Sequence, residues 1–191
     1  MESKKVPKSS IKIINDIIGG QESTLARHKL KEICIEVKSP AKYTVNDTAS
    51  RLIGCKPCRV STFSKDGRGR AQKSVKLALN GKTETTRVDF RPWHLAFAYV
   101  GVDKETGSDV WRTIPEDREW SHRCIEENCI EVTHGLWETS AQNKDRWSCR
   151  NAAQVIVDGN VHMLCRHQPP CLNPKVSEKG SADHAVNLPI A

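Results

Sequence analysis

The sequence predicts an α+β fold made of short helices, antiparallel β-hairpins, and loops that are braced by clustered cysteine and histidine residues. Apolar residues recur at helical spacing over 11–18 and 22–33. Residues 73–90 instead alternate between apolar and polar side chains, as strands with one buried face do. Of the 191 residues, 37% are hydrophobic, which suits a single domain with a small core. The cysteine and histidine clusters between 121 and 171 are therefore expected to contribute much of the stability.

The N-terminal region, 1–53, is expected to be partly helical and otherwise flexible. Its first residues include Ser-Lys-Lys-Val-Pro-Lys, which is either a weak nuclear-import signal or a solvated tail. Ser10 is expected to cap a helix over Ile11–Ile18, and a second helix is expected over Glu22–Ile33. No apolar run approaches the roughly 18 residues of a membrane-spanning helix, so no membrane span is predicted.

The middle of the chain is expected to form a β-ribbon. Val75 and Leu77 begin the alternation, and Asn80-Gly81 is typical of a two-residue hairpin turn. Leu95–Val102 is expected to be a more buried strand. The chain has 30 Lys and Arg residues against 23 Asp and Glu residues, and its net charge of +7 favours a polyanionic partner.

A two-stranded ribbon can enter the major groove of double-stranded DNA. The polar residues of this ribbon are therefore candidate DNA contacts, and a solvated sheet face explains them equally well. These candidates are Gln72, Lys73, Lys76, Lys82, Thr85 and Arg87.

Two sets of residues have the types and spacing of zinc ligands. Cys124, Cys129 and His134 follow one another at Cys-x4-Cys-x4-His spacing, which only a compact loop can bring to one point. No signal peptide is visible in MESKKVPKSS, so metal binding is favoured over disulfide pairing. The second set, in which His162 competes with His167, consists of Cys149, Cys165, His167 and Cys171. The sequence thus predicts two structural zinc ions, each contributing about 10–16 kcal/mol of apparent folding free energy.

The run 121–149, Ser-His-Arg-Cys-x4-Cys-x4-His followed by Trp-Glu, Asn-Lys-x-Arg and Cys, resembles the His-Cys box homing endonucleases. These are ββα-metal, or His-Me finger, nucleases that are encoded in mobile group I introns. The spacing Cys-x-His-x3-Cys over 165–171 is also similar to the family, and 63–70 resembles the strand that carries its active-site arginine. The resemblance extends over 54–171. It implies a strand ending near His122, the zinc loop, a second strand, and a helix that Thr139 or Ser140 caps.

The resemblance implies three roles in phosphodiester hydrolysis, and the chemistry of the residues fits each role. His122 matches the general base, because a neutral imidazole takes up a proton near pH 7. Asn143 matches the residue that binds the catalytic Mg²⁺, since Mg²⁺ prefers oxygen ligands. Arg70 matches the residue that holds the scissile phosphate, although Arg68 lies on the same basic run. The Gly-Cys pair at 54–55 makes Cys55 the expected fourth ligand of the first zinc, with Cys58 as the alternative.

The resemblance also implies a domain organisation and a biological role. The nuclease core, 54–171, divides into a β-rich DNA-binding part, 54–118, and a ββα and zinc part, 119–171. The tail, 172–191, either wraps a partner subunit or is disordered. A homodimer would cut each DNA strand once, leave 5′-phosphate and 3′-hydroxyl ends, and spread its group I intron into ribosomal DNA in the nucleus. The alternatives are a less specific nuclease and a zinc-dependent DNA-binding protein that does not cleave.

Overall fold

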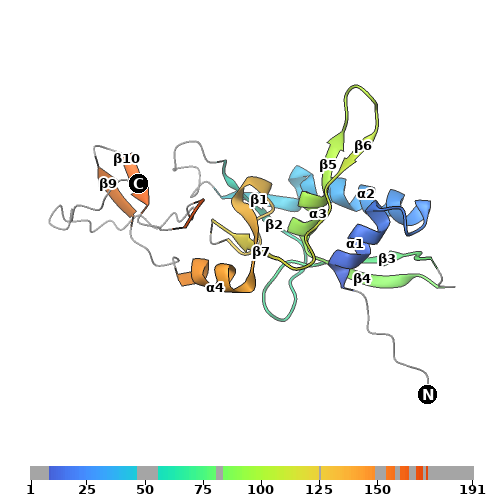
Figure 1. Ribbon diagram of the computed structural model, residues 1–191, viewed down its shortest axis with the longest axis horizontal. Helices are drawn as coiled ribbons and strands as arrows, with labels where there is room; N and C mark the ends of the chain where they lie inside the picture. Colours follow the sequence, from blue (N-terminus) through green and yellow to red (C-terminus); the bar gives the residue numbers. More distant parts are fainter. Residues whose placement is uncertain are drawn as a thin grey trace, which may run out of the picture.

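The computed structural model describes residues 9–46, 56–80, 84–124, 126–148, 154–157, 160–163, 167–169 and 171. These residues form helices and small antiparallel sheets, which confirms the predicted α+β class (Figure 1). In chain order the elements are α1 (Ser10–Ile18), α2 (Thr24–Lys38), η1 (Pro40–Lys42), β1 (Tyr43–Asn46), β2 (Cys58–Ser61), β3 (Lys73–Leu77), β4 (Thr86–Phe90), α3 (Pro92–Ala98), β5 (Tyr99–Val102), β6 (Asp109–Trp111), β7 (Glu119–His122), η3 (Val132–His134), β8 (Gly135–Glu138), α4 (Ser140–Ser148), β9 (Gln154–Val157) and β10 (Asn160–Met163).

Serine caps begin both N-terminal helices. Ser9 Oγ accepts a hydrogen bond from the backbone N–H of Lys12 at 3.1 Å, and Ser23 Oγ accepts one from Ala26 at 3.0 Å. A hydroxyl at this position satisfies a donor that the first helical turn leaves open. Helix α1 therefore starts one residue earlier than predicted, with Ser9 as its cap, and α2 continues past the predicted end to Lys38.

One hydrophobic core joins the N-terminal helices to the middle of the chain. Side chains of α1 and α2 pack against the β3–β4 ribbon and α3, and the fully buried ones include Ile14, Leu30, Phe90 and Leu95. The predicted N-terminal region thus shares its core with the β-rich part, and the predicted boundary between 53 and 54 lies outside the described residues. Among the described residues, no helix has the length and apolar character needed to cross a membrane.

The segment predicted as a buried strand over 95–102 is helical in its first half and a strand in its second half. Helix α3 spans Pro92–Ala98, and only Tyr99–Val102 is extended. Pro92 occupies the first turn, where its missing N–H costs nothing and its fixed φ suits a helix. The side chains of Trp93, Leu95 and Ala96 are all buried, so this apolar run packs as a helix buried on most sides.

The β3–β4 ribbon forms as predicted, but its register differs from the one that an Asn80-Gly81 turn would set. Such a turn would pair Leu77 with Glu84, whereas Leu77 pairs with Thr86. The shift is even, so each side chain keeps its face. Asn80 is instead held from outside the ribbon, because its backbone N–H donates to Glu22 Oε2 at 2.6 Å and its Nδ2 to Gln21 O at 2.9 Å.

The β7–β8 hairpin and α4 follow one another as the sequence predicts. The two strands are antiparallel, with His122 opposite Gly135. Thr139 and Gln142 form a reciprocal cap on α4: the Gln142 N–H donates to Thr139 Oγ1 at 3.2 Å, and the Thr139 N–H donates to Gln142 Oε1 at 3.0 Å. Helix α4 packs against both strands, which completes a strand–strand–helix unit.

Candidate active site and metal centre

Three thiols and one imidazole come together in a buried cluster. Cys58, Cys124, Cys129 and His134 each offer one ligand atom, and these atoms all lie within 4.8 Å of one another. The Nδ1 atom of His134 lies 3.5 Å from Cys58 Sγ and 3.6 Å from Cys129 Sγ. Tetrahedral zinc with bonds near 2.3 Å to sulfur places its ligands roughly 3.8 Å apart. The cluster therefore fits a structural zinc ion, with Nδ1 as the imidazole ligand.

The fourth residue of this cluster comes from a distant part of the chain. Ile130 donates its N–H to Arg59 O at 2.8 Å, and Ser61 donates its N–H to Asn128 O at 2.9 Å. These bonds attach the zinc loop to β2 and bring Cys58 beside the other ligands. Cys58 was the alternative to Cys55 for this position, and Cys55 lies outside the described residues.

Hydrogen bonds among the three neighbouring thiols favour a thiolate in the cluster, which can bind a cation. Hydrogen bonds from Cys124 and Cys58 lower the pKa of Cys129. The hydrogen bond to Cys129 raises the pKa of Cys124, because Cys124 keeps its own proton to donate to the Cys129 thiolate. Zinc binds thiolates rather than thiols, so metal binding would release the remaining protons.

Only part of the second predicted zinc site lies within the described residues. His167 Nδ1 and Cys171 Sγ are 3.7 Å apart, whereas Cys149 and Cys165 lie outside the described residues. The other ring nitrogen of His167 lies 3.1 Å from Asp145 Oδ2 on α4. A carboxylate at this position directs the opposite nitrogen, Nδ1, toward a metal.

A buried ion pair connects this second cluster to the hairpin. The Arg146 guanidinium makes two contacts with the Glu138 carboxylate, at 2.6 and 3.0 Å. Its Nη1 also donates to Pro169 O at 2.9 Å and lies 3.4 Å from Cys171 Sγ. The hydrogen bonds to Glu138 raise the pKa of Arg146, so the guanidinium stays charged. Arg146 thereby links α4 to Glu138 of β8 and to Pro169 and Cys171.

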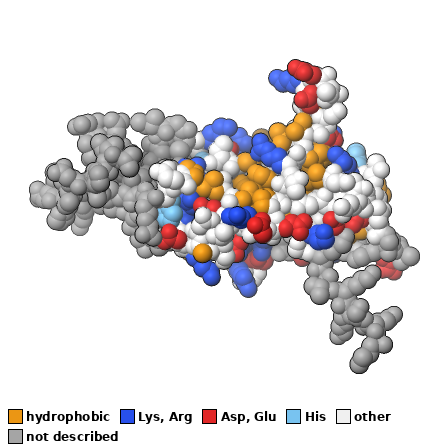
Figure 2. All heavy atoms as spheres, in the orientation of Figure 1, with side chains coloured by type: hydrophobic (Ala, Val, Ile, Leu, Met, Phe, Trp, Pro, Cys, Tyr) orange, Lys and Arg blue, Asp and Glu red, His pale blue; other side chains and the backbone are white. Residues whose placement is uncertain are grey.

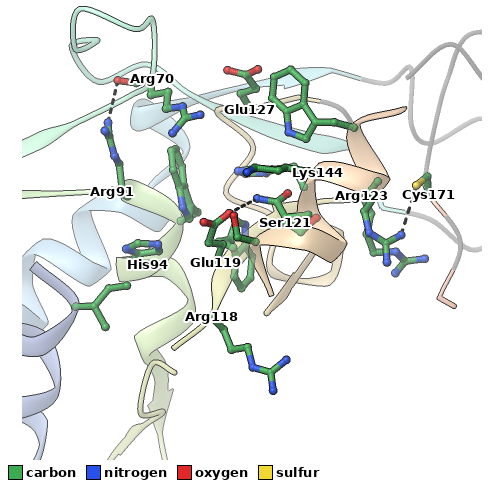
Figure 3. A pocket seen from close by; sticks show the side chains of 18 residues that line it. Arg70, Arg91, His94, Arg118, Glu119, Ser121, Arg123, Glu127, Lys144 and Cys171 are labelled. Carbon is green, nitrogen blue, oxygen red and sulfur yellow. Dashed lines mark hydrogen bonds between the residues drawn. The ribbon is translucent and has the colours of Figure 1, made fainter. Parts of the chain in front are cut away.

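A pocket of about 670 Å³ lies beside α4 and β7, and all three residues predicted to act in hydrolysis line it. His122 comes from the end of β7, Asn143 from α4, and Arg70 from the loop before β3. Figure 3 shows further charged side chains around the same space, among them Arg91, Arg118 and Lys144. The excess of cations suits a pocket that binds an anionic group.

His122 is held in an aromatic environment. Its ring centroid lies 5.1 Å from that of Trp93 and 6.3 Å from that of Trp120, both in edge-to-face geometry. Both ring nitrogens are buried and have no hydrogen-bond partner among the described residues. Burial lowers the pKa of His122 to about 4. The imidazole is therefore neutral at pH 7 and has lone-pair capacity for a proton.

Asn143 presents its side-chain amide in one defined orientation. Its Nδ2 donates to Glu119 Oε2 at 2.9 Å, so its carbonyl oxygen is left as a possible ligand. Glu119 lies on β7, and the hydrogen bond from Asn143 lowers the pKa of its carboxyl group. The carboxylate is thus charged at pH 7 and accepts hydrogen bonds only.

A network around Asp66 holds the loop that carries Arg70. Asp66 Oδ1 accepts from the backbone N–H groups of Arg68 at 2.9 Å and Arg70 at 3.0 Å. Arg91 donates to Asp66 Oδ2 at 2.6 Å, and this bond lowers the pKa of Asp66 to about 2. Of the two arginines that the sequence left open, Arg70 lines the pocket and Arg68 is exposed outside it.

Gly135 allows Trp120 to lie flat over β8. A Cβ added at Gly135 would overlap the Trp120 indole, and the backbone there is extended (φ −120°), so the obstacle is steric. We expect Gly135→Ala to destabilise the protein by about 1–3 kcal/mol through overpacking, and to displace Trp120 from its place beside His122. Urea unfolding compared with Gly67→Ala, whose added Cβ meets nothing within 4 Å, measures this effect. Equal stability of the two variants would contradict the prediction.

The residues predicted to contact DNA are placed differently from one another. Lys76 and Arg87 form a cross-strand pair on the exposed face of the ribbon, and Thr85 is also exposed. Lys73 instead forms an ion pair with Glu36 at 2.7 Å. Gln72 is half-buried, and Lys82 lies outside the described residues. On the face shown in Figure 2, Lys and Arg side chains are spread over the surface among acidic ones.

The site contains residues that sequence reasoning missed. Glu119, Trp93 and Arg91 all line the pocket. Glu119 lies an odd number of positions from His122 on the same strand, so strand alternation places it on the opposite face and gives no reason to link the two. Trp93 comes just before the segment that was predicted as a strand. Its contact with His122 depends on helix α3, so the predicted strand gave no reason to expect it.

The fold and the site together define a nuclease-type protein in which a Cys₃His zinc centre supports a strand–strand–helix unit. A family model described as the zinc-binding loop region of homing endonuclease matches residues 58–182, more than half of the chain, and the chain belongs to this family. The match begins at Cys58 and includes every residue of the metal cluster. No curated protein and no solved structure matched the chain.

Proposed function

We propose that the protein is a site-specific DNA endonuclease that hydrolyses phosphodiester bonds with Mg²⁺ and leaves 5′-phosphate and 3′-hydroxyl ends. The observation that carries this proposal is that His122, Asn143 and Arg70 line one pocket. These three side chains come from three separate elements, so their convergence does not follow from closeness in the sequence. The family assignment supports the same class of enzyme and DNA as its partner.

The side chains have complementary tasks in this reaction. Neutral His122 would take the proton from the attacking water, and its low pKa keeps it unprotonated at physiological pH. The Arg70 guanidinium would bind the non-bridging oxygens of the scissile phosphate, whose geometry matches its two parallel N–H groups. Trp93 and Trp120 contact the imidazole in edge-to-face geometry and limit its orientation.

The side-chain amide of Asn143 fits a hard cation. Its hydrogen bond to Glu119 uses the NH₂ end, so the carbonyl oxygen is available as the kind of oxygen ligand that Mg²⁺ prefers to sulfur or nitrogen. When bound, Mg²⁺ would neutralise phosphoryl charge and stabilise the leaving 3′ oxygen. Asn143 is the residue that would hold it.

The wider role follows from the same proposal. A homodimer would give each DNA strand its own pocket, with dimer symmetry matching a nearly palindromic target. Each subunit would hold a second zinc ion at Cys149, Cys165, His167 and Cys171, in addition to the zinc of the Cys58 cluster. The enzyme would act in the nucleus, where cutting an intronless allele spreads its group I intron. Lys76 and Arg87 on the exposed ribbon face would contact DNA outside the pocket.

Cleavage assays with two DNA substrates test the proposal. We expect the wild type to cut a ribosomal DNA segment with Mg²⁺ and to cut random DNA far less. Asn143→Ala should lower the cleavage rate by at least about 100-fold while zinc content and DNA binding are kept. Binding without cleavage by the wild type would identify a non-cleaving zinc protein and reject the nuclease. Equal cutting of both substrates would reject site specificity.

A further inference from the structure

Glu119 is one of two acidic residues, with Glu127, in a pocket whose other charged side chains are mostly cations. It lines the pocket together with Arg70, Arg118 and Lys144, and its carboxyl group is ionised at pH 7 (Figure 3). A fixed negative charge opposes the binding of a phosphodiester. An acid at this position is therefore a cost for DNA binding unless it serves another charged group that enters the same pocket.

The hydrogen bonds of Glu119 show what it holds. Its Oε2 accepts from Asn143 Nδ2 at 2.9 Å, and Ser140 is near enough to help lower the pKa of the Glu119 carboxyl group. Both residues belong to the first turns of α4, so this carboxylate on β7 lies at the start of the helix. Because a carboxylate accepts hydrogen bonds and cannot donate them, only the NH₂ end of the Asn143 amide can face it. The carbonyl end must then face away from Glu119.

We propose that Glu119 is a positioning residue of the cation site, which fixes the Asn143 amide so that its carbonyl oxygen is presented to a divalent cation in the pocket. This inference rests on the proposed function, which makes Asn143 the cation ligand. Glu119 acts on the cation through Asn143, in the way that carboxylates behind metal-binding histidines orient their ligands.

The substitution Glu119→Gln would keep the size of the side chain but would no longer fix the orientation of the Asn143 amide. A glutamine offers Asn143 either its carbonyl oxygen or its NH₂ group, so both orientations of the Asn143 amide become possible. In one of them the Asn143 oxygen is occupied by the glutamine and unavailable to a cation. Loss of an orienting partner of this kind typically lowers metal affinity by about 10-fold or more.

Glu127 provides a matched control, because it is a second acid of the same pocket and the Asn143 amide donates to Glu119 instead. Glu119→Gln and Glu127→Gln each remove one negative charge, but only the first removes the partner of Asn143. We expect Glu119→Gln to raise the Mg²⁺ concentration for half-maximal cleavage about 10-fold. Glu127→Gln should raise it no more than about twofold, because the charge of an acid at an open pocket is screened. Equal rises in the two variants would show a charge effect and overturn the inference.

A second measurement does not depend on cleavage. The side-chain amide signal of Asn143 in a ¹⁵N–¹H spectrum can be assigned by its loss in Asn143→Ala. We expect this signal to move in Glu119→Gln and to stay in Glu127→Gln, and Mn²⁺ should broaden it at lower concentration in the wild type than in Glu119→Gln. An unmoved signal, with equal Mn²⁺ broadening, would overturn the inference even in an active enzyme. A wild type that cuts no DNA would overturn the proposed function alone, and the spectra would still decide the role of Glu119.

Discussion

Replacing Cys58 by serine is expected to abolish zinc binding at the Cys58 cluster and to unfold the β7–β8 hairpin. A structural zinc of this type contributes about 10–16 kcal/mol of apparent folding free energy. A domain of ordinary stability has only about 5–15 kcal/mol in total, so the loss exceeds what packing can replace. The loop around Cys124 and Cys129 is otherwise held by two backbone hydrogen bonds to β2 and by the Asn128 side chain, which bonds to Gly69 and Ala71, and these contacts are weaker than a bound zinc.

Metal analysis and near-ultraviolet circular dichroism measure this effect. Cys58→Ser should lose one zinc per chain together with the tryptophan signal of Trp120 and Trp137, which lie opposite one another in the hairpin. Cys34→Ala is the matched control, since Cys34 is buried in α2 outside the metal cluster and should keep full zinc content. Cys55→Ser distinguishes the two candidate ligands. Retained zinc in Cys58→Ser with lost zinc in Cys55→Ser would assign the site to Cys55 and contradict the prediction.

The zinc loop shows which part of a metal site can be read from a sequence. Cys124, Cys129 and His134 lie within one short loop, so their spacing alone predicts that they converge. The remaining ligand depends on how β2 docks against the loop, through bonds such as Ile130 N–H to Arg59 O. This docking is a long-range event, and local spacing left both cysteines of Cys-Lys-Pro-Cys open. The choice between them required the fold.

Secondary structure was predictable where a local signal or the family resemblance placed it. The apolar spacing over 11–18 marks helix α1, and the β7–β8–α4 unit lies where the resemblance implied, with Thr139 as the cap of α4. The run 92–98 has no such periodic signal, because a helix buried on most sides and a buried strand are both continuously apolar. In the β3–β4 ribbon, the Asn80-Gly81 turn signal indicates a register that the strands do not have. Asn80 instead forms hydrogen bonds to the segment that connects α1 and α2.

The second large effect is expected from His122→Ala, which should lower the single-turnover cleavage rate by about 10²–10⁴-fold, the usual contribution of a general base. The His122 imidazole is neutral at pH 7, as is that of His94 in the same pocket, and both ring nitrogens of His122 lack a hydrogen-bond partner among the described residues, so it can take up a proton. Its removal leaves Arg70 and Asn143 in place, so DNA binding and zinc content should not change. His28→Ala, in an exposed histidine of α2, is the control for loss of a histidine elsewhere. Cleavage by His122→Ala at the wild-type rate would show that another group is the base.

The pH dependence of cleavage separates a buried base from an ordinary one. Burial lowers the pKa of His122 to about 4, so the proton-accepting form persists as the pH falls through 6.5, where a solvated histidine would be half protonated. We therefore expect a cleavage rate that stays level between pH 8 and pH 6 and falls only toward pH 4. A midpoint near 6.5, measured where zinc content is unchanged, would show that the base is solvated. The same shift destabilises the folded state in acid, because below about pH 6.5 the unfolded chain binds a proton that the folded chain takes up only near pH 4.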